Sequence, residues 1–164
     1  MNAERKSSRF TKSVAGPFGP ALLGALLRMP WEVVRRRMLE RLHERGFEDL
    51  DLAHLNVFLF PGPQGLKPSE LAARMGASKQ SVNHLLGQME RLGYLERRDD
   101  RDDRRSTRIH LTARGKAVVV TIRQAVMEVE RAWERKLGRK RLEQLRALLV
   151  ELWDESAALQ GPGS

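Results

Sequence analysis

The sequence predicts a mainly α-helical protein that carries one short two-stranded sheet. Apolar residues recur at helical spacing near the start of the chain, as at Trp31, Val34 and Met38, and again through its last third. Between these regions, a helical-hairpin pattern (68–92) is followed by a charged stretch (94–111) that is typical of two short strands joined by a tip. This order favours a winged helix-turn-helix with a two-stranded wing and long N- and C-terminal helices.

The first 19 residues have the composition of a flexible basic arm, and their cations are Arg5, Lys6, Arg9 and Lys12. Such an arm is either a solvated tail or a segment that contacts DNA. A helix is expected from about Pro20 to Arg45, interrupted or kinked at Pro30, because proline removes one helical hydrogen bond. Gly46 supplies the C-terminal stop.

The middle of the chain carries clear helix boundaries. A short helix is expected from about Asp51 to Phe60, and the proline and glycine residues of 61–65 break it. Pro68 suits the first position of the next helix, and Gly76 suits its end. Ser78 then suits the N-cap of the second helix of the pair.

After the wing, Thr112 is the expected cap of a long helix that reaches about Leu137. Gly138 then marks a turn, and a last helix extends to about Leu159. The prediction is one domain over 20–159, with a winged lobe at 50–111, helices at 20–46 and 112–159, and a tail at 160–164. The terminal helices carry more apolar surface than a small core needs. They form either an intrachain bundle or a homodimer, and twofold symmetry suits a DNA reader.

Charge and cysteine content limit the classes of function. The 164 residues contain 30 Lys and Arg against 21 Asp and Glu, a net charge of +9, which favours a polyanionic partner. There is no cysteine, which excludes disulfides, thiolate metal sites and cysteine-based redox sensing. The apolar run 21–27 is too short to span a bilayer and a poor signal peptide, so we expect a cytoplasmic protein that does not enter membranes.

The helix that Ser78 caps has one apolar side and one hydrogen-bonding side. At 100° per residue, its aliphatic residues gather on one face, whereas Gln80 and His84 point the opposite way. Side chains of these types can address base edges in a major groove. The alternative is an ordinary solvated face, but such faces are usually rich in Glu and Lys. His84 lacks a second ligand at i+4, where Gln88 stands, so we expect neither a metal nor a cofactor.

Five short stretches of the sequence resemble motifs of the MarR (multiple-antibiotic-resistance regulator) family of bacterial winged helix-turn-helix repressors. They are Ser69-Glu-Leu-Ala72, Ser78-Lys-Gln-Ser81, Met89-Glu-Arg-Leu-Gly-Tyr-Leu95, Asp103-Arg-Arg105 and Leu111-Thr-Ala-Arg-Gly115. The resemblance covers roughly residues 20–159, and it implies that the long terminal helices form a dimer interface. Where the family often has proline two residues before the wing aspartate, this chain has Arg101, which suggests a looser and more basic tip.

The resemblance also implies roles in the wing. Asp103 would orient Arg105, whose guanidinium would enter the minor groove, and Arg104 would lie near the DNA backbone. Ser81 and His84 would contact bases or phosphates. The full set of expected DNA-binding residues is Ser78, Lys79, Gln80, Ser81, Asn83, His84, Gln88, Arg98, Arg101, Asp103, Arg104 and Arg105. The alternative for the wing is a solvated hairpin whose ion pairs cancel one another.

The predicted function is sequence-specific transcriptional regulation: a homodimer, acting as a ligand-responsive repressor, on a pseudo-palindromic operator in double-stranded DNA. By resemblance the effector is a small aromatic or amphipathic molecule. Trp31, His54 and Phe58 would either line its cavity or belong to the core. The alternative function is a winged-helix module that binds an acidic protein. An enzyme is not expected, because the histidines are scattered and neither a phosphate-binding glycine loop nor a nucleophile–base pair is evident.

Overall fold

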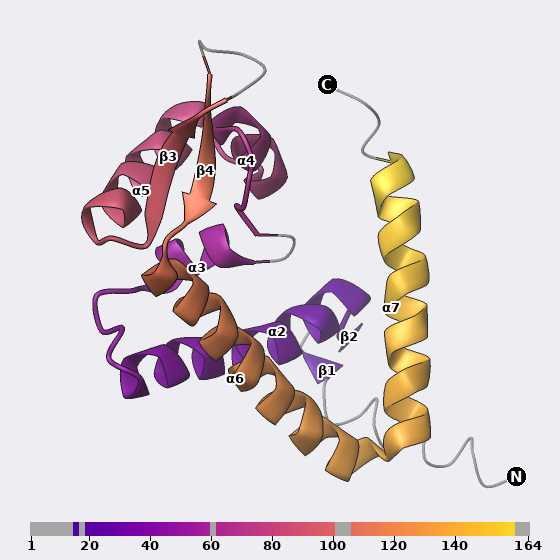
Figure 1. The fold of residues 1–164 in the computed structure, drawn as a ribbon. Helices are drawn as coiled ribbons and strands as arrows, with labels where there is room; N and C mark the ends of the chain where they lie inside the picture. Colours follow the sequence, from indigo (N-terminus) through magenta and orange to yellow (C-terminus); the bar gives the residue numbers. More distant parts are fainter. Residues whose placement is uncertain (1–14, 17–18, 60–61, 101–105, 160–164) are drawn as a thin grey trace, which may run out of the picture.

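The computed structural model describes residues 15–16, 19–59, 62–100 and 106–159, and it describes side chains for 21–59, 62–100 and 106–153. It confirms a mainly helical fold with a two-stranded antiparallel wing (Figure 1). We call residues 50–111 the winged lobe, and helices α2, α6 and α7 the helical frame. Within the expected N-terminal arm, Ala15–Gly16 (β1) and Gly19–Pro20 (β2) pair antiparallel, which the sequence analysis did not predict.

Helix α2 (Leu23–Glu44) begins three residues later than expected and contains Pro30 in its interior. The predicted interruption at Pro30 is therefore wrong, while the alternative, a kink at Pro30, stays a prediction. Proline leaves the carbonyl of Leu26 without a helical donor. Leu26 and Met29 are both exposed, so water can reach this part of the helix and the local cost is limited. Gly46 follows the helix with a φ of 83°, as expected of its stop.

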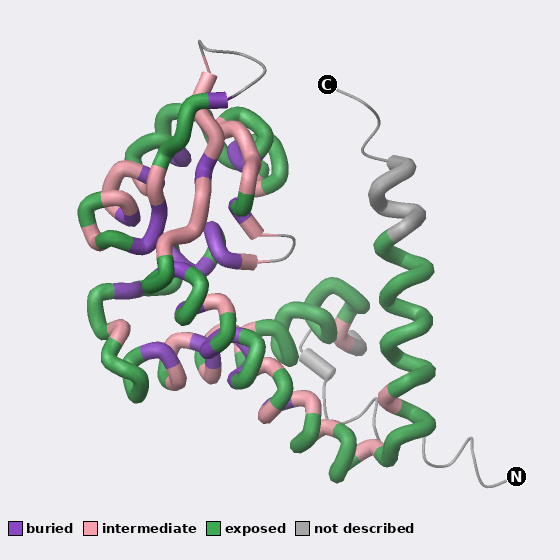
Figure 2. The backbone as a smooth tube through the Cα atoms, in the orientation of Figure 1, coloured by how far each residue is buried: buried purple, intermediate pink, exposed green. Residues whose placement is uncertain are grey.

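Helices α2 and α6 (Ala113–Leu137) cross and bury their apolar faces against each other (Figure 2). Val34, Met38 and Leu42 contribute the buried face of α2. Val118, Ile122 and other small apolar residues contribute the buried face of α6. This crossing extends the core of the lobe into the helical frame.

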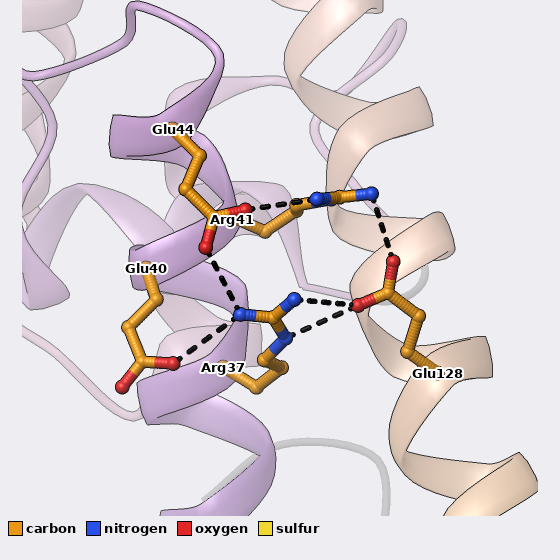
Figure 3. A network of polar contacts seen from close by, with 5 residues as sticks. All are labelled: Arg37, Glu40, Arg41, Glu44 and Glu128. Atoms are coloured by element: carbon orange, nitrogen blue, oxygen red, sulfur yellow. Dashed lines mark hydrogen bonds and ion pairs between the residues drawn. The ribbon is translucent and has the colours of Figure 1, made fainter.

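An ion-pair network joins the same two helices on their outer side (Figure 3). Arg37 contacts Glu128 at 2.8 Å and Arg41 contacts the second oxygen of Glu128 at 3.0 Å. Glu44 accepts from both arginines, at 3.2 and 2.8 Å. The hydrogen bond from Arg41 lowers the pKa of Glu44, and that from Arg37 adds to the effect. The network orients α2 on α6, but its exposed pairs add little stability.

The winged lobe contains three short helices and the wing. They are α3 (Leu52–Phe58), α4 (Pro68–Met75), α5 (Lys79–Arg91), β3 (Leu95–Asp99) and β4 (Thr107–Leu111). Pro68 occupies the first turn of α4, as predicted, and Gly76 ends that helix in the left-handed conformation with φ 58°. Leu66 adds a bridge to Ile109, so the loop before α4 extends the wing's sheet on one side.

Asp51 caps α3, and we expect this cap to make stability depend on acid pH. Its side chain accepts from the backbone N–H groups of Ala53 and His54 at 2.8 and 2.9 Å. The hydrogen bond from His54 is the main reason that the pKa of Asp51 is lowered. A lowered carboxyl pKa adds stability that is present above the unfolded value, about pH 4, and is lost as the pH falls through the folded value.

Asp51→Ala is therefore expected to lower the free energy of unfolding by about 1 kcal/mol at pH 7, with less effect at pH 3. Urea titration at the two pH values measures this. Asp51→Asn is the control, because asparagine also caps helices but does not titrate. A loss in Asp51→Ala of the same size at both pH values would contradict the assigned role of the carboxylate.

Helix α7 (Arg139–Leu159) turns back from the end of α6 that is far from the lobe (Figure 1). Thr112 caps α6 as predicted, accepting from Gly115 N–H at 3.1 Å. Large apolar side chains are exposed on α7, where Trp153 is 65% exposed, and along the first half of α2 (Figure 2). Among the described residues, none of the helices has the length and apolar character that crossing a bilayer requires.

Candidate nucleic-acid interface

Helix α5 presents its polar side to solvent because its apolar side is anchored in the core. Val82, Leu86 and Met89 are at most 1% exposed. The predicted reading residues Lys79, Gln80, Ser81, Asn83 and His84 are all exposed, and Gln88 is half-buried. The sidedness expected from the 3.6-residue period is therefore present in the structure.

Ser78 and Ser81 form the N-terminal cap of α5. The Ser78 hydroxyl oxygen accepts from the Ser81 backbone N–H at 3.1 Å, and the two hydroxyl groups lie 2.8 Å apart. These contacts hold both hydroxyl groups at the exposed helix end, where the helix dipole also favours a phosphate. Both residues were predicted as DNA contacts, and Ser78 was also the predicted cap.

Arg97 of β3 connects the wing to α5. Its guanidinium donates to Glu90 at 3.1 Å and reaches the side-chain oxygen of Asn83 at 3.5 Å. Asn83 is exposed, but its side-chain oxygen already faces Arg97 of the wing. Its amide NH₂ is therefore the group left to contact a base edge. Arg97 was not among the expected DNA contacts, because nothing local distinguishes it from the other arginines of the wing.

The strands of the wing pair from Leu95 with Leu111 to Asp99 with Thr107. Arg98 is exposed, and its Nε donates to Glu96 at 2.9 Å on the same face of β3. Such an exposed pair is weak enough to exchange for a phosphate. The other expected wing contacts, Arg101, Asp103, Arg104 and Arg105, lie outside the described residues.

A buried carboxylate lies at the far end of the wing strands, where β3 leads into the tip. Asp100 is 3% exposed, and its Oδ2 lies 3.0 Å from Arg108 Nε and 3.3 Å from Lys67 Nζ. The Ser106 hydroxyl donates to the same oxygen at 3.2 Å, and the Asp100 N–H donates to the Ser106 carbonyl at 3.0 Å. Because Lys67 is the N-cap of α4, the wing is tied to the helix pair. This role of Asp100 was not predicted, since Asp100 is one of several aspartates in a highly charged stretch.

Two cations on α5 lack an acidic partner in the part of the chain that the structure describes. Neither Lys79 in the first turn nor Arg91 in the last forms an ion pair there. Both side chains are exposed. A phosphate would therefore not need to displace a carboxylate from either.

A cavity of about 1000 Å³ lies between the helical frame and the winged lobe. Trp31 and Phe58, two of the three residues predicted for an effector site, are among its lining residues, together with Met38, Ile122 and Trp153. Arg123, Glu130 and Gln64 supply polar groups at its wall. The arrangement can bury an apolar molecule while satisfying a few polar atoms.

His54, the third predicted effector residue, does not line this cavity. Its side chain is buried, and its Nδ1 accepts from the Asp51 backbone N–H at 3.2 Å. Its Nε2 has no hydrogen-bond partner among the described residues. The structure thus places His54 in the capping box of α3.

Comparisons with known proteins agree with this geometry. The family model described as MarR family matches residues 48–106. An uncharacterised HTH-type transcriptional regulator, YfiV of Bacillus subtilis (strain 168), is 32% identical over 71 residues, which are 43% of this chain and 44% of the relative. The chain matches less than half the length of the curated relatives.

Solved structures extend the likeness over most of the chain. The crystal structure of MarR superimposes with a TM-score of 0.71 at 22% identity, covering 86% of this chain and 95% of that one. An S. aureus MepR–DNA complex superimposes with a TM-score of 0.62 at 23% identity, covering 82% and 98%. At these identities the superpositions establish the fold. Residues 48–106 of this chain therefore match the MarR family model, and the described chain shares the fold of the MarR crystal structure.

Proposed function

We propose that two copies of this chain bind double-stranded DNA as a sequence-specific transcriptional regulator. Helix α5 enters the major groove and the wing lies along the flanking minor groove. The observation that carries this proposal is the exposed face of α5, where Gln80, Ser81 and His84 lie opposite the buried aliphatic residues. A major groove admits one helix and presents donors and acceptors that such side chains can read. The fold shared with the MepR–DNA complex supports this placement.

Homodimerisation accounts for the exposed apolar surface of the helical frame. Leu148 and Trp153 on α7 are 57% and 65% exposed, and Leu22 before α2 is 82% exposed. A monomer with so much apolar surface on its helices would aggregate, whereas a second copy would bury it. Light scattering at micromolar concentration is expected to give twice the chain mass. A monodisperse monomer would contradict the proposal.

Selection of bound duplexes from a random pool, at near-physiological salt, tests the function itself. We expect two inverted half-sites whose centres lie about 10 base pairs, or a multiple of this, apart. If the chain instead binds an acidic protein through its basic wing, no duplex will be preferred over random DNA. As a repressor, the proposed regulator should reduce transcription when the selected site overlaps a promoter. Increased transcription from that position would show that it is an activator instead.

Arg105→Ala is expected to weaken binding to the selected operator by about 1–3 kcal/mol, because a minor-groove guanidinium contributes to shape readout. Lys79→Ala is expected to weaken binding to cognate and random duplexes alike and to reduce the salt slope by about one, because Lys79 would meet a phosphate. Fluorescence anisotropy over a salt series measures both. Equal losses on cognate and random DNA in both variants would contradict this division of roles.

We further propose that a small aromatic or amphipathic molecule in the 1000 Å³ cavity weakens DNA binding. Two of the three tryptophans, Trp31 and Trp153, line the cavity, so ligand entry should change the intrinsic fluorescence. Val126→Trp, which fills the cavity from α6, should abolish that change and leave the operator affinity in the absence of ligand close to that of the wild type. Operator affinity that is unaffected by every cavity ligand would count against regulation through this cavity.

A further inference from the structure

Tyr94 lies where the winged lobe meets the helical frame. The chain passes from the frame into the lobe through the α2–α3 connection (45–51), which contains Asp49. It returns at Thr112, where β4 leads into α6, and Arg114 lies in the first turn of that helix. Tyr94 immediately precedes β3, within the lobe. A contact among these side chains therefore spans both passages of the chain.

The Tyr94 hydroxyl group makes that contact. It donates to the Asp49 carboxylate and accepts from Arg114 at 2.9 Å. Arg114 also donates to Asp49 at 2.9 Å, which closes a triangle of three side chains. Burial raises the pKa of Tyr94 to about 12, and the bond to Asp49 adds to the effect. The hydroxyl group therefore keeps its proton, and its role as donor, at physiological pH.

The Tyr94 ring is held as firmly as its hydroxyl group. The residue is 0% exposed, and its ring lies 6.2 Å from the rings of both Phe47 and Phe58. The Arg114 guanidinium lies 4.5 Å from the ring centroid, so it contacts the face of the ring as well as the hydroxyl group. The ring has little freedom to turn, and the direction of the hydroxyl group is set.

The backbone forms the second half of this joint. The Tyr94 carbonyl accepts from the Thr112 N–H at 3.1 Å and from its hydroxyl group at 3.1 Å. Gly115 lies so close that a Cβ there would be 2.1 Å from the same carbonyl oxygen. The first turn of α6 is thus pressed against Tyr94 by its backbone, and the side-chain triangle resists rotation about that point.

We propose that the Tyr94 hydroxyl group locks the angle between the winged lobe and α6, and that this angle decides which half-site separation the dimer reads. The inference rests on the proposed function. A lobe of this size is roughly 25 Å across, so a rotation of about 8° at the joint moves its far edge by about 3.5 Å, close to one base-pair step. Tyr94 is thereby a positioning residue: it touches no DNA and acts through the placement of α5.

Tyr94→Phe tests the lock, because it removes only the hydroxyl group and leaves Asp49 paired with Arg114. The readout is affinity for duplexes whose two half-sites are separated in steps of one base pair, together with affinity for an isolated half-site. The wild type should prefer its best separation by about tenfold over neighbours one step away. In Tyr94→Phe this ratio should fall to about twofold, with half-site affinity unchanged within about twofold. An unchanged ratio, or a loss confined to half-site affinity, would overturn the proposal.

Thr121→Val is the matched control. It removes a buried hydroxyl group that donates to the Ala117 carbonyl at 2.9 Å inside α6, away from the joint. The separation preference should stay at the wild-type ratio in this variant. If Thr121→Val lowers the ratio of affinities between half-site separations as much as Tyr94→Phe does, the effect comes from a general loss of rigidity, and the proposal for Tyr94 is refuted.

A second measurement needs no DNA. Because the chain contains no cysteine, a spin-label pair can be placed at Ala73→Cys on α4 and Arg131→Cys on α6, both exposed positions. The distance distribution between the labels should be narrow in the protein that keeps Tyr94 and broad in the Tyr94→Phe variant. Equal widths would overturn the lock. If no duplex binds to the wild type, the proposed function and the separation role fall together, while the label distances still report whether the hydroxyl group holds the two parts.

Discussion

Leu86→Ala is expected to lower the free energy of unfolding by about 2–5 kcal/mol. Leu86 is 0% exposed and lies in the middle of the buried face of α5, between Val82 and Met89. Truncation removes apolar contacts and leaves a cavity that a helix held on both sides cannot close. Since a domain of this kind has a total stability of only about 5–15 kcal/mol, the variant will be partly unfolded at moderate urea concentrations.

The midpoint of urea unfolding, followed by circular dichroism, measures the loss. Gln80→Ala is the control on the opposite side of the same helix, where the side chain is exposed and a change of at most about 0.5 kcal/mol in stability is expected. If the proposed function is right, Gln80→Ala should weaken operator binding although the protein stays fully folded. A loss of stability in Gln80→Ala as large as that in Leu86→Ala would show that α5 is not oriented as described.

Gly115→Ala is expected to destabilise the protein by about 1–3 kcal/mol, or more if the backbone cannot move. The new methyl group would lie 2.1 Å from the Tyr94 carbonyl oxygen and 3.1 Å from Leu111 Cδ2. The oxygen belongs to the backbone and already accepts from Thr112, so relief requires α6 to shift away from the wing. Both the joint and the helix cap would be disturbed.

Thermal unfolding of Gly115→Ala against Gly24→Ala separates the clash from the intrinsic effect of the substitution. Gly24 lies in α2 with open space around it, so alanine there should be neutral or stabilising by about 0.5–1 kcal/mol. If Gly115→Ala unfolds at the same temperature as the wild type, the close approach of α6 to Tyr94 is not maintained in solution.

Several elements were predictable because the signals that define them are local. Ser78 and Thr112 cap the helices expected of them, and Gly76 ends α4 in the conformation that glycine favours. The buried face of α5 follows from the helical period. In each case the deciding contacts lie within four residues along the chain, so residue type and spacing are sufficient. The wing strands were likewise expected within the range that they occupy.

Other features depend on contacts between residues far apart in the sequence. Asp49 meets Arg114 across 65 positions, and the cavity gathers Trp31, Phe58 and Trp153 from three helices. Nothing in the local sequence distinguishes Asp100 from Asp99, yet in the described part of the chain Asp99 is exposed, whereas the Asp100 side chain is buried beside Lys67 and Arg108. The position of His54, by contrast, is set by a local contact, because its hydrogen bond with the Asp51 backbone N–H directs the side chain away from the cavity that it was predicted to line.

The amino-acid sequence by itself determined the caps at Ser78 and Thr112, the end of α4 at Gly76, the polar side of α5 and the presence of a wing, because each depends on neighbours within a turn or a strand. The tertiary structure alone decided how the lobe is joined to the frame, which aspartate supports the wing, and that α2 continues through Pro30. These outcomes depend on which distant surfaces meet, and on whether burial or water satisfies the polar groups left there.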